Sequence, residues 1–480
     1  MTGAASTHLR RWVAPGVLVL TIVAFAAGSS SVRPVAETAL TLRWAALFAL
    51  VVVALAIAGT DRASIGRLGS IAWLAALPAG FLALAALSTA WSADPPLTFA
   101  RAGSFGLVLT ATAGLALGLD REGRMRVLAA IPLGAGIVAV LGLALWVVSP
   151  DYAVQQQPTS ASPWRFRGFG ENPNTAAMLY AIALPVAGWL ALEARSRVRR
   201  AVASGAVALF YVGIVLAQSR GALLAAFFGM TVLALALVRG VPRKAGAVGL
   251  VALVFVAGNA VRTVNTPEIA PPPPREQFVP AERPAGEPGA VRPVPTPAGE
   301  EPGTIEVYFP RFRGRLDIKP ADEIGHPMLT DARGVSLGSG RLDAWIGALD
   351  LVADRPLLGH GFGTEPVVFV DRWYVFQGGY VENSYIGILL QLGGVGLALF
   401  AAFGLFLLAR GVRGLRRAPV GDRGLVAACL ATVVAGAGLM LVQSFVYSVG
   451  NVATVSFWTA AFVLAVATAR TEPDDARRPA

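Results

Sequence analysis

Several polar segments adjoin long apolar stretches of this sequence, and their ionisable residues are the first candidates for chemistry. Two of them are Gln218-Ser219-Arg220-Gly221 and Val381-Glu382-Asn383-Ser384-Tyr385. Charged groups are costly at the edge of a membrane, so each is a candidate for function. Desolvation at that edge would raise the pKa of the Glu382 carboxyl group and suit it to accept a hydroxyl proton. The structural alternatives are that Arg220 extends to the lipid headgroups and that Glu382 only interacts with a helix dipole.

A third segment has the composition of an anion site. It is Arg165-Phe166-Arg167-Gly168-Phe169-Gly170-Glu171-Asn172-Pro173-Asn174. Pro173 can begin a helix, and free amide groups at a helix N-terminus flanked by two arginines suit a phosphate. Alternatively, Asn172 and Asn174 only cap the helix. Arg43 and Arg101 are further possible phosphate donors. The candidate substrate-binding residues are Arg101, Arg165, Arg167, Asn172, Asn174, Ser219 and Asn383.

A fourth group combines glycines with an arginine and a histidine. It consists of Gly338-Ser339-Gly340-Arg341 and Leu357-Leu358-Gly359-His360-Gly361-Phe362-Gly363. These glycines would allow the backbone to approach a ligand closely. The chain has 3 histidines and 1 cysteine, Cys429, so we expect neither a multi-histidine nor a cysteine metal site, nor a cofactor. A lone histidine such as His360 is more often structural than catalytic.

The elements that position these residues are membrane spans. Of 480 residues, 55% are hydrophobic and 14% charged, which excludes a water-soluble fold. The apolar residues form stretches of the length that a helix needs to cross a bilayer. About twelve spans are predicted, at 12–28, 37–59, 70–90, 103–119, 127–149, 175–191, 201–218, 222–238, 245–261, 385–409, 425–447 and 452–469. We therefore expect an all-α polytopic membrane protein, whose first span stays as an anchor.

The basic residues predict the orientation of these spans. The net charge is +11, but the arginines are distributed by loop and not collected on one domain, so we expect no nucleic-acid partner. Most lie in alternate loops, as the positive-inside rule requires for cytoplasmic loops. Both termini are therefore predicted to be cytoplasmic. Residues 1–262 would form nine spans, 263–384 one long extracytoplasmic loop, and 385–480 three spans and a cytoplasmic tail.

The long loop divides into two parts. Residues 266–303 are rich in proline and predict an extended tether. Within 304–384, residues 305–309 predict a strand and 341–354 a helix, with Ser339 as its cap. In that helix an apolar stripe is formed by Leu342, Trp345, Ile346, Leu349 and Val352. The stripe predicts a face that packs against the bundle or lies along the membrane, and the alternative is a partner-binding surface.

The ordered set of motifs from about residue 160 to 400 resembles the O-antigen ligase and polymerase family. The matching motifs are Gly170-Glu171-Asn172-Pro173-Asn174, Gln218-Ser219-Arg220-Gly221-Ala222-Leu223, Gly340-Arg341 with Trp345, Arg355-Pro356-Leu357-Leu358-Gly359 and Glu382-Asn383-Ser384-Tyr385. The resemblance implies a membrane glycosyltransferase of GT-C-like fold in the bacterial inner membrane. Its donor would be a glycan on undecaprenyl diphosphate, and its acceptor a lipid-linked or other glycan hydroxyl, with inversion and without a metal.

The resemblance also implies roles for the candidate catalytic residues. Arg220 and Arg341 would hold the diphosphate leaving group. The family usually has a histidine immediately before the asparagine that opens the tenth span, where this sequence has Glu382. A carboxylate can serve as base in inverting sugar transfer. Ligation and polymerisation both stay open, and the rival readings are a transporter or exporter of lipid-linked glycan and a non-enzymatic envelope assembly protein.

Overall fold

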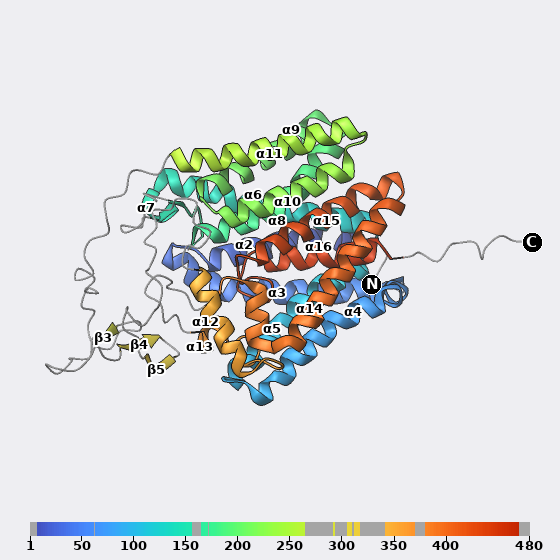
Figure 1. Ribbon diagram of the computed structural model, residues 1–480. Coiled ribbons are helices and arrows are strands. Elements are labelled where there is room, and N and C mark those ends of the chain that lie inside the picture. Colours follow the sequence, from blue (N-terminus) through green and yellow to red (C-terminus); the bar gives the residue numbers. More distant parts are fainter. Residues whose placement is uncertain are drawn as a thin grey trace, which may run out of the picture.

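The computed structural model describes residues 7–61, 63–155, 165–170, 172–264, 291–292, 305–309, 312–316, 341–369 and 380–469. Long helices pack side by side into one bundle (Figure 1). The helices before the long loop are η1 (Leu9–Val13), α2 (Ala14–Gly28), α3 (Arg33–Thr60), α4 (Ala63–Leu87), η2 (Ser88–Trp91), α5 (Pro95–Gly118), α6 (Arg121–Val148), α7 (Pro150–Ala153), α8 (Pro173–Glu193), α9 (Arg197–Leu216), α10 (Arg220–Leu237) and α11 (Val241–Val264). Those after it are α12 (Arg341–Asp354), α13 (Glu365–Val368), α14 (Ser384–Arg417), α15 (Val420–Met440) and α16 (Thr454–Ala467).

The helices confirm the predicted fold class. In the described part of the chain, 11 helices are long and apolar enough to cross a membrane, and they overlap all but the last of the predicted spans. The last contains α16, which has 14 residues, or about 21 Å at the helical rise of about 1.5 Å per residue. The protein is thus an all-α polytopic membrane protein. The sidedness and the domain boundaries remain predictions.

The bundle has two distinct ends. The start of α2 and the end of α16 lie at one end, whereas α12 and α13 lie at the other (Figure 1). Small residues bring the central helices close together: a Cβ atom added to Gly229 of α10 would lie 2.9 Å from that of Ala435 in α15. Close approach of this kind is how helices associate in lipid, where apolar burial gives little driving force.

The eleventh predicted span, 425–447, is wrong at its C-terminal end. Helix α15 stops at Met440, and residues 441–453, which we call the α15–α16 connection, form turns. Side chains satisfy its buried backbone: Ser384 Oγ donates to Gln443 O at 2.6 Å and accepts from Phe445 N at 3.1 Å. Apolar composition predicts burial but not backbone shape. Irregular backbone is tolerated at membrane depth where protein buries it.

Helix α14 contains a break that the sequence pattern does not reveal. Gly393 has φ +63° and interrupts the helix. The loop after α12 inserts there, so that Gly394 N donates to Pro356 O at 2.7 Å and His360 N to Leu390 O at 3.0 Å. A Cβ atom on Gly393 would lie 2.2 Å from the carbonyl carbon of Leu357. The break therefore positions the loop that carries α13.

Two predicted elements of the long loop are present in the structure, and one predicted face is corrected. Helix α12 and strand β4 (Ile305–Phe309) have the predicted bounds. However, α12 buries Val352 of the predicted stripe together with Ala344 and Ala348, whereas Ile346 and Leu349 of that stripe are each 46% exposed. The alanines let α12 approach α14 closely, with Leu390 in the same cluster. Packing on the bundle is confirmed, but through a rotated face.

The remaining strands are short. Strand β4 pairs antiparallel with β3 (Val291–Arg292) and β5 (Phe312–Leu316), and β1 (Val154–Gln155) pairs antiparallel with β2 (Arg165–Phe166). Apart from β3, the predicted proline-rich tether lies outside the described residues, as does Ser339.

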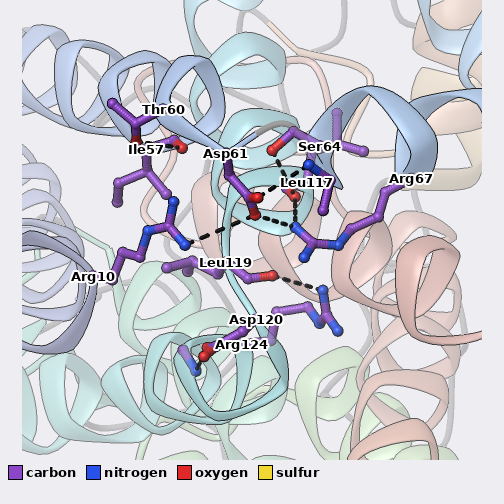
Figure 2. A network of polar contacts seen from close by, with 12 residues as sticks. Arg10, Ile57, Thr60, Asp61, Ser64, Arg67, Leu117, Leu119, Asp120 and Arg124 are labelled. Carbon is purple, nitrogen blue, oxygen red and sulfur yellow. Dashed lines mark hydrogen bonds and ion pairs between the residues drawn. The ribbon is translucent and has the colours of Figure 1, made fainter. Parts of the chain in front are cut away.

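A polar network joins the helix ends at the side where the chain begins (Figure 2). Asp61 lies 2.9 Å from Arg67 Nη1 and 3.8 Å from Arg10 Nη1. Arg67 also donates to Leu117 O, and Arg124 donates to Leu119 O at 2.7 Å. The network ties the turn between α3 and α4 to the end of α5 and the start of α6.

Candidate functional site

Arg220 is the first residue of α10 and follows a tight turn. Gln218 has φ +51°, an unusual value for a residue with a Cβ. Ser219 occupies the cap position but its hydroxyl makes no capping hydrogen bond, and it is buried. The next residue, Gly221, packs against Val442, because a Cβ added there would lie 2.3 Å from Val442 Cγ2. The turn therefore places Arg220 beside the α15–α16 connection.

Arg341 begins α12 and faces Glu382. Its Nη2 atom lies 3.7 Å from Glu382 Oε2, an ion pair too long for a hydrogen bond. Arg341 Nε and Glu382 Oε2 are both buried, and neither has a hydrogen-bond partner among the residues that the structure describes. Arg220 lies near enough to Arg341 to repel it. The three candidate catalytic residues, which are far apart in the sequence, are thus brought together.

The backbone and surroundings of Glu382 are both unusual. Its φ is +55°, in the left-handed region that residues with a Cβ rarely adopt. Burial raises the pKa of its carboxyl group, and the charge of Arg341 opposes that rise. Asn383 follows it and caps α14 by accepting from Tyr385 N at 3.0 Å and Ile386 N at 3.1 Å. Asn383 also donates to Leu441 O at 3.1 Å.

Glu365, at the start of α13, is a second carboxyl group that sequence reasoning missed. It is 1% exposed. Its Oε1 accepts from Val381 N at 2.6 Å and Ser444 Oγ at 3.0 Å. Its Oε2 accepts from Tyr447 OH at 2.6 Å and Gln391 Nε2 at 3.1 Å. The local signal for it is weak: Glu365 precedes a short apolar run at residues 366–370, and this pattern does not reveal which groups contact the carboxyl group.

The bonds of Glu365 connect three segments of the chain. They join α13 to the residue before Glu382, to α14 and to the α15–α16 connection. Burial raises the pKa of the Glu365 carboxyl group to about 7, and the hydrogen bond from Tyr447 opposes that rise. The negative charge of Glu382 raises it further. The two carboxyl groups are therefore close enough to influence each other.

The glycines after α12 approach protein backbone and side chains in this structure. A Cβ atom on Gly359 would lie 2.4 Å from the carbonyl carbon of Gln391, and one on Gly361 would lie 2.3 Å from Ser92 Oγ. Both have positive φ values. The ring of His360 contacts Leu351 O through Nε2 at 2.9 Å, in agreement with a structural histidine. These residues hold the loop against α14 and the α4–α5 turn.

The predicted anion segment before α8 is engaged with nearby backbone. Arg165 donates to Ala217 O at 3.0 Å and to Asn174 Oδ1 at 3.0 Å. Arg167 donates to Tyr152 O at 2.8 Å and Asp151 O at 2.9 Å. Asn172 caps α8 by accepting from Asn174 N at 2.8 Å. Arg165 thus supports the turn that precedes Arg220, whereas Arg167 supports the end of α7.

Arg101 lies in α5 and lines a small cavity that Glu365 also lines. A Cβ atom on Gly363 would lie 2.5 Å from Arg101 Cγ, so the loop glycine fits against the arginine side chain. Among the seven candidate binding residues, Arg101, Arg165, Ser219 and Asn383 therefore belong to or contact the segments that carry the two carboxyl groups or Arg220.

Together the fold and the site define a polytopic membrane protein with arginines and buried carboxyl groups at one end of its helical bundle. The O-antigen ligase family model matches residues 204–401, which confirms the resemblance for this part of the chain. The match contains Arg220, Arg341, Glu365 and Glu382. This family suggests membrane glycan transfer of the O-antigen ligase or polymerase type. No curated protein matches the chain significantly.

Proposed function

We propose that this protein transfers a glycan from a polyprenyl diphosphate, such as undecaprenyl diphosphate, to a sugar hydroxyl group, with inversion and without a metal. The observation that supports the proposal is the convergence of Arg220, Arg341 and Glu382 at one place. Within the described part of the chain, Arg341 Nε and Glu382 Oε2 are buried without hydrogen-bond partners, and such atoms are costly unless a ligand satisfies them.

In the proposed reaction Glu382 is the base. Its carboxylate accepts the proton of the acceptor hydroxyl group, and the acceptor oxygen forms a bond to the anomeric carbon. The bond between that carbon and the diphosphate oxygen breaks, and the electron pair leaves with the diphosphate. Because attack and departure occur on opposite faces, the anomeric centre is inverted. Arg220 and Arg341 neutralise the charge that develops on the leaving group.

Glu365 acts on this reaction through Glu382. Its carboxylate accepts from Val381 N, and the Asn383 side chain caps α14 on the other side of Glu382. These two anchors over-determine the backbone between them, which is what a left-handed conformation needs in order to persist. Glu365 is thus a positioning residue in the proposed site.

We further propose that the site faces outward from the bacterial inner membrane. The positive-inside pattern supports this orientation, with both termini in the cytoplasm and residues 263–384 outside. The acceptor would be lipid-linked or a growing glycan, which covers both ligation and polymerisation. The donor and acceptor would both reach the site from the outer leaflet.

The test is a glycan-stained gel of envelope material from a deletion strain. The expected result is a lost or shortened surface glycan that the wild-type gene restores and that normally expressed Glu382→Ala or Arg220→Ala copies do not. Glu37→Ala and Arg33→Ala are matched controls, because these two residues form an exposed ion pair on α3, and both should restore the glycan.

The pattern on the gel separates the two reactions. Loss of the ladder beyond its first repeat indicates polymerisation, and accumulation of unattached lipid-linked polymer indicates ligation. If both site variants restore the glycan, the proposed site is wrong. If the gel is unchanged in the deletion strain, a transporter or assembly protein becomes the better explanation.

A further inference from the structure

Arg43 is a charged residue inside the span formed by α3. Its Nε atom is buried and has no hydrogen-bond partner among the described residues. Its guanidinium carbon lies 5.4 Å from the centre of the Trp44 ring. The side chain fits against Gly28, where a Cβ atom would lie 3.2 Å from Arg43 Cδ, and its Nη1 would lie 3.6 Å from a Cβ atom on Gly450. Arg43 therefore reaches the α15–α16 connection.

Arg101 on α5 is its neighbour. The two arginines lie near enough to interact electrostatically as like charges. Neither forms an ion pair within 4.0 Å in the described part of the chain, and neither guanidinium group donates a hydrogen bond there. Glu365 lines the same cavity as Arg101, but its two oxygens already accept four hydrogen bonds. One such carboxyl group does not neutralise two guanidinium groups.

Two uncompensated like charges within a membrane bundle are costly. A phosphate group between them would remove that cost, since each guanidinium can donate to its oxygens. We propose that Arg43 and Arg101 form a second phosphate-binding subsite, which takes the phosphate of a lipid-anchored acceptor. This inference rests on the proposed function, in which Arg220 and Arg341 hold the donor.

The placement of the two arginine pairs supports this division. The α15–α16 connection contacts the Arg220 turn through Val442 and approaches Arg43 through Gly450. Between these contacts, Ser444 and Tyr447 bind Glu365, which influences Glu382 electrostatically. The carboxyl groups thus lie between two cationic sites. A transfer between two lipid-anchored substrates needs this arrangement, because each substrate brings its own phosphate to the membrane surface while the reacting sugars meet between them.

The test counts phosphate-binding sites. Its probe is a short lipid with a phosphate-containing headgroup, which both proposed arginine sites should bind. Full-length protein in phosphatidylcholine nanodiscs is titrated with farnesyl diphosphate in a calorimeter. We expect two sites per chain in the wild type, one in R43Q/R101Q and one in R220Q/R341Q. The control is R33Q, because Arg33 also lies on α3 but its side chain is 90% exposed, and it should keep two sites. Circular dichroism and thermal melting check that each variant is folded.

The outcomes separate this inference from the proposed function. If folded R43Q/R101Q keeps two sites, or the wild type has only one and R220Q/R341Q abolishes it, the acceptor subsite is refuted while the donor site stands. If R220Q/R341Q changes nothing and R43Q/R101Q loses one site, the second subsite stands and the donor site fails. Nanodiscs that contain phosphatidylglycerol should give the same counts. Loss of one site there would identify a bilayer headgroup as the ligand of Arg43 and Arg101 and overturn the acceptor assignment.

Discussion

The two ends of the bundle both contain acidic residues beside arginines, but they use them differently. At the end shown in Figure 2, Asp61 accepts from Arg67 at 2.9 Å and from Ala63 N at 3.0 Å. At the opposite end, Glu382 meets Arg341 only at 3.7 Å, and its Oε2 is buried without a hydrogen bond. Buried Nε atoms without partners occur at both ends, at Arg10 and at Arg341. The two ends therefore differ in the environment of the carboxyl group, not in that of the arginines.

Under the proposed function, this difference separates charges that hold helices together from charges that bind a ligand. A carboxylate that accepts from a neighbouring backbone amide and from an arginine on the next helix stabilises the turn it belongs to. A carboxyl group that is desolvated and incompletely bonded is costly to the fold, and such groups cluster at functional sites. The contrast predicts opposite responses to substitution at the two ends.

The largest effect is expected for Glu382→Gln, which removes the proposed base and keeps the shape of the side chain. The rate of glycan transfer should fall by about 100- to 10,000-fold, the usual contribution of general-base catalysis. In the wild type the rate should also decline on acidification at a higher pH than an ordinary glutamate would give, because burial raises the pKa of Glu382 and the base must be ionised. A purified transfer assay across pH measures both, with Glu37→Gln as control. A wild-type rate in Glu382→Gln would rule out this base.

A smaller effect is expected for Glu365→Gln. The new amide group places a hydrogen-bond donor where the carboxylate accepts from Tyr447, Gln391 or Val381. The resulting shift of Glu382 should lower kcat on the order of 10- to 100-fold, because misplacement of a reacting group slows the chemical step. KM should change little. Binding of the polyprenyl-diphosphate donor substrate should be unaffected. An unchanged kcat would show that Glu382 keeps its geometry without Glu365.

The same variant should change how stability depends on pH. The folded protein binds the proton of Glu365 more tightly than the unfolded chain does, because the folded pKa is about 7 against an ordinary value of 4.5. The stabilisation from this group is thus complete below about pH 4.5 and is lost as pH rises through about 7. As the pH rises from about 4.5 to about 7, the melting temperature of the wild type should fall, and that of Glu365→Gln should fall less.

The smallest effect on transfer is expected for Asp61→Asn at the other end. Removing the carboxylate leaves Arg10 and Arg67 without their acid, and the free energy of unfolding should fall by about 1–3 kcal/mol, the cost of unsatisfied buried donors. The transfer rate of the folded fraction should stay within about twofold of wild type, since a site far from the chemistry contributes little to it. Loss of glycan transfer in a folded Asp61→Asn protein would refute the proposal that the charges at this end are only structural.

Part of this site could be predicted from the sequence because its residues stand out against apolar surroundings. Arg220 and Glu382 each adjoin a long hydrophobic stretch, where charge is expensive, whereas Arg341 begins a short amphipathic helix in the long loop; the three residues lie close together in the structure. Glu365 could not be assigned in this way, since its importance comes from donors that lie 16 to 82 positions away along the chain. The convergence of Arg43 and Arg101 likewise depends on how α3 packs against α5.

The sequence by itself determined the class of protein, because the length and apolar composition of the spans follow directly from the thickness of a bilayer. It also determined the bounds of α12 and β4, which depend on local pattern and local stop signals. Only the tertiary structure decided where α15 ends, which face of α12 is buried, and that α14 breaks at Gly393. In each case the backbone groups find partners on segments that are remote in sequence, and local periodicity carries no information about those partners.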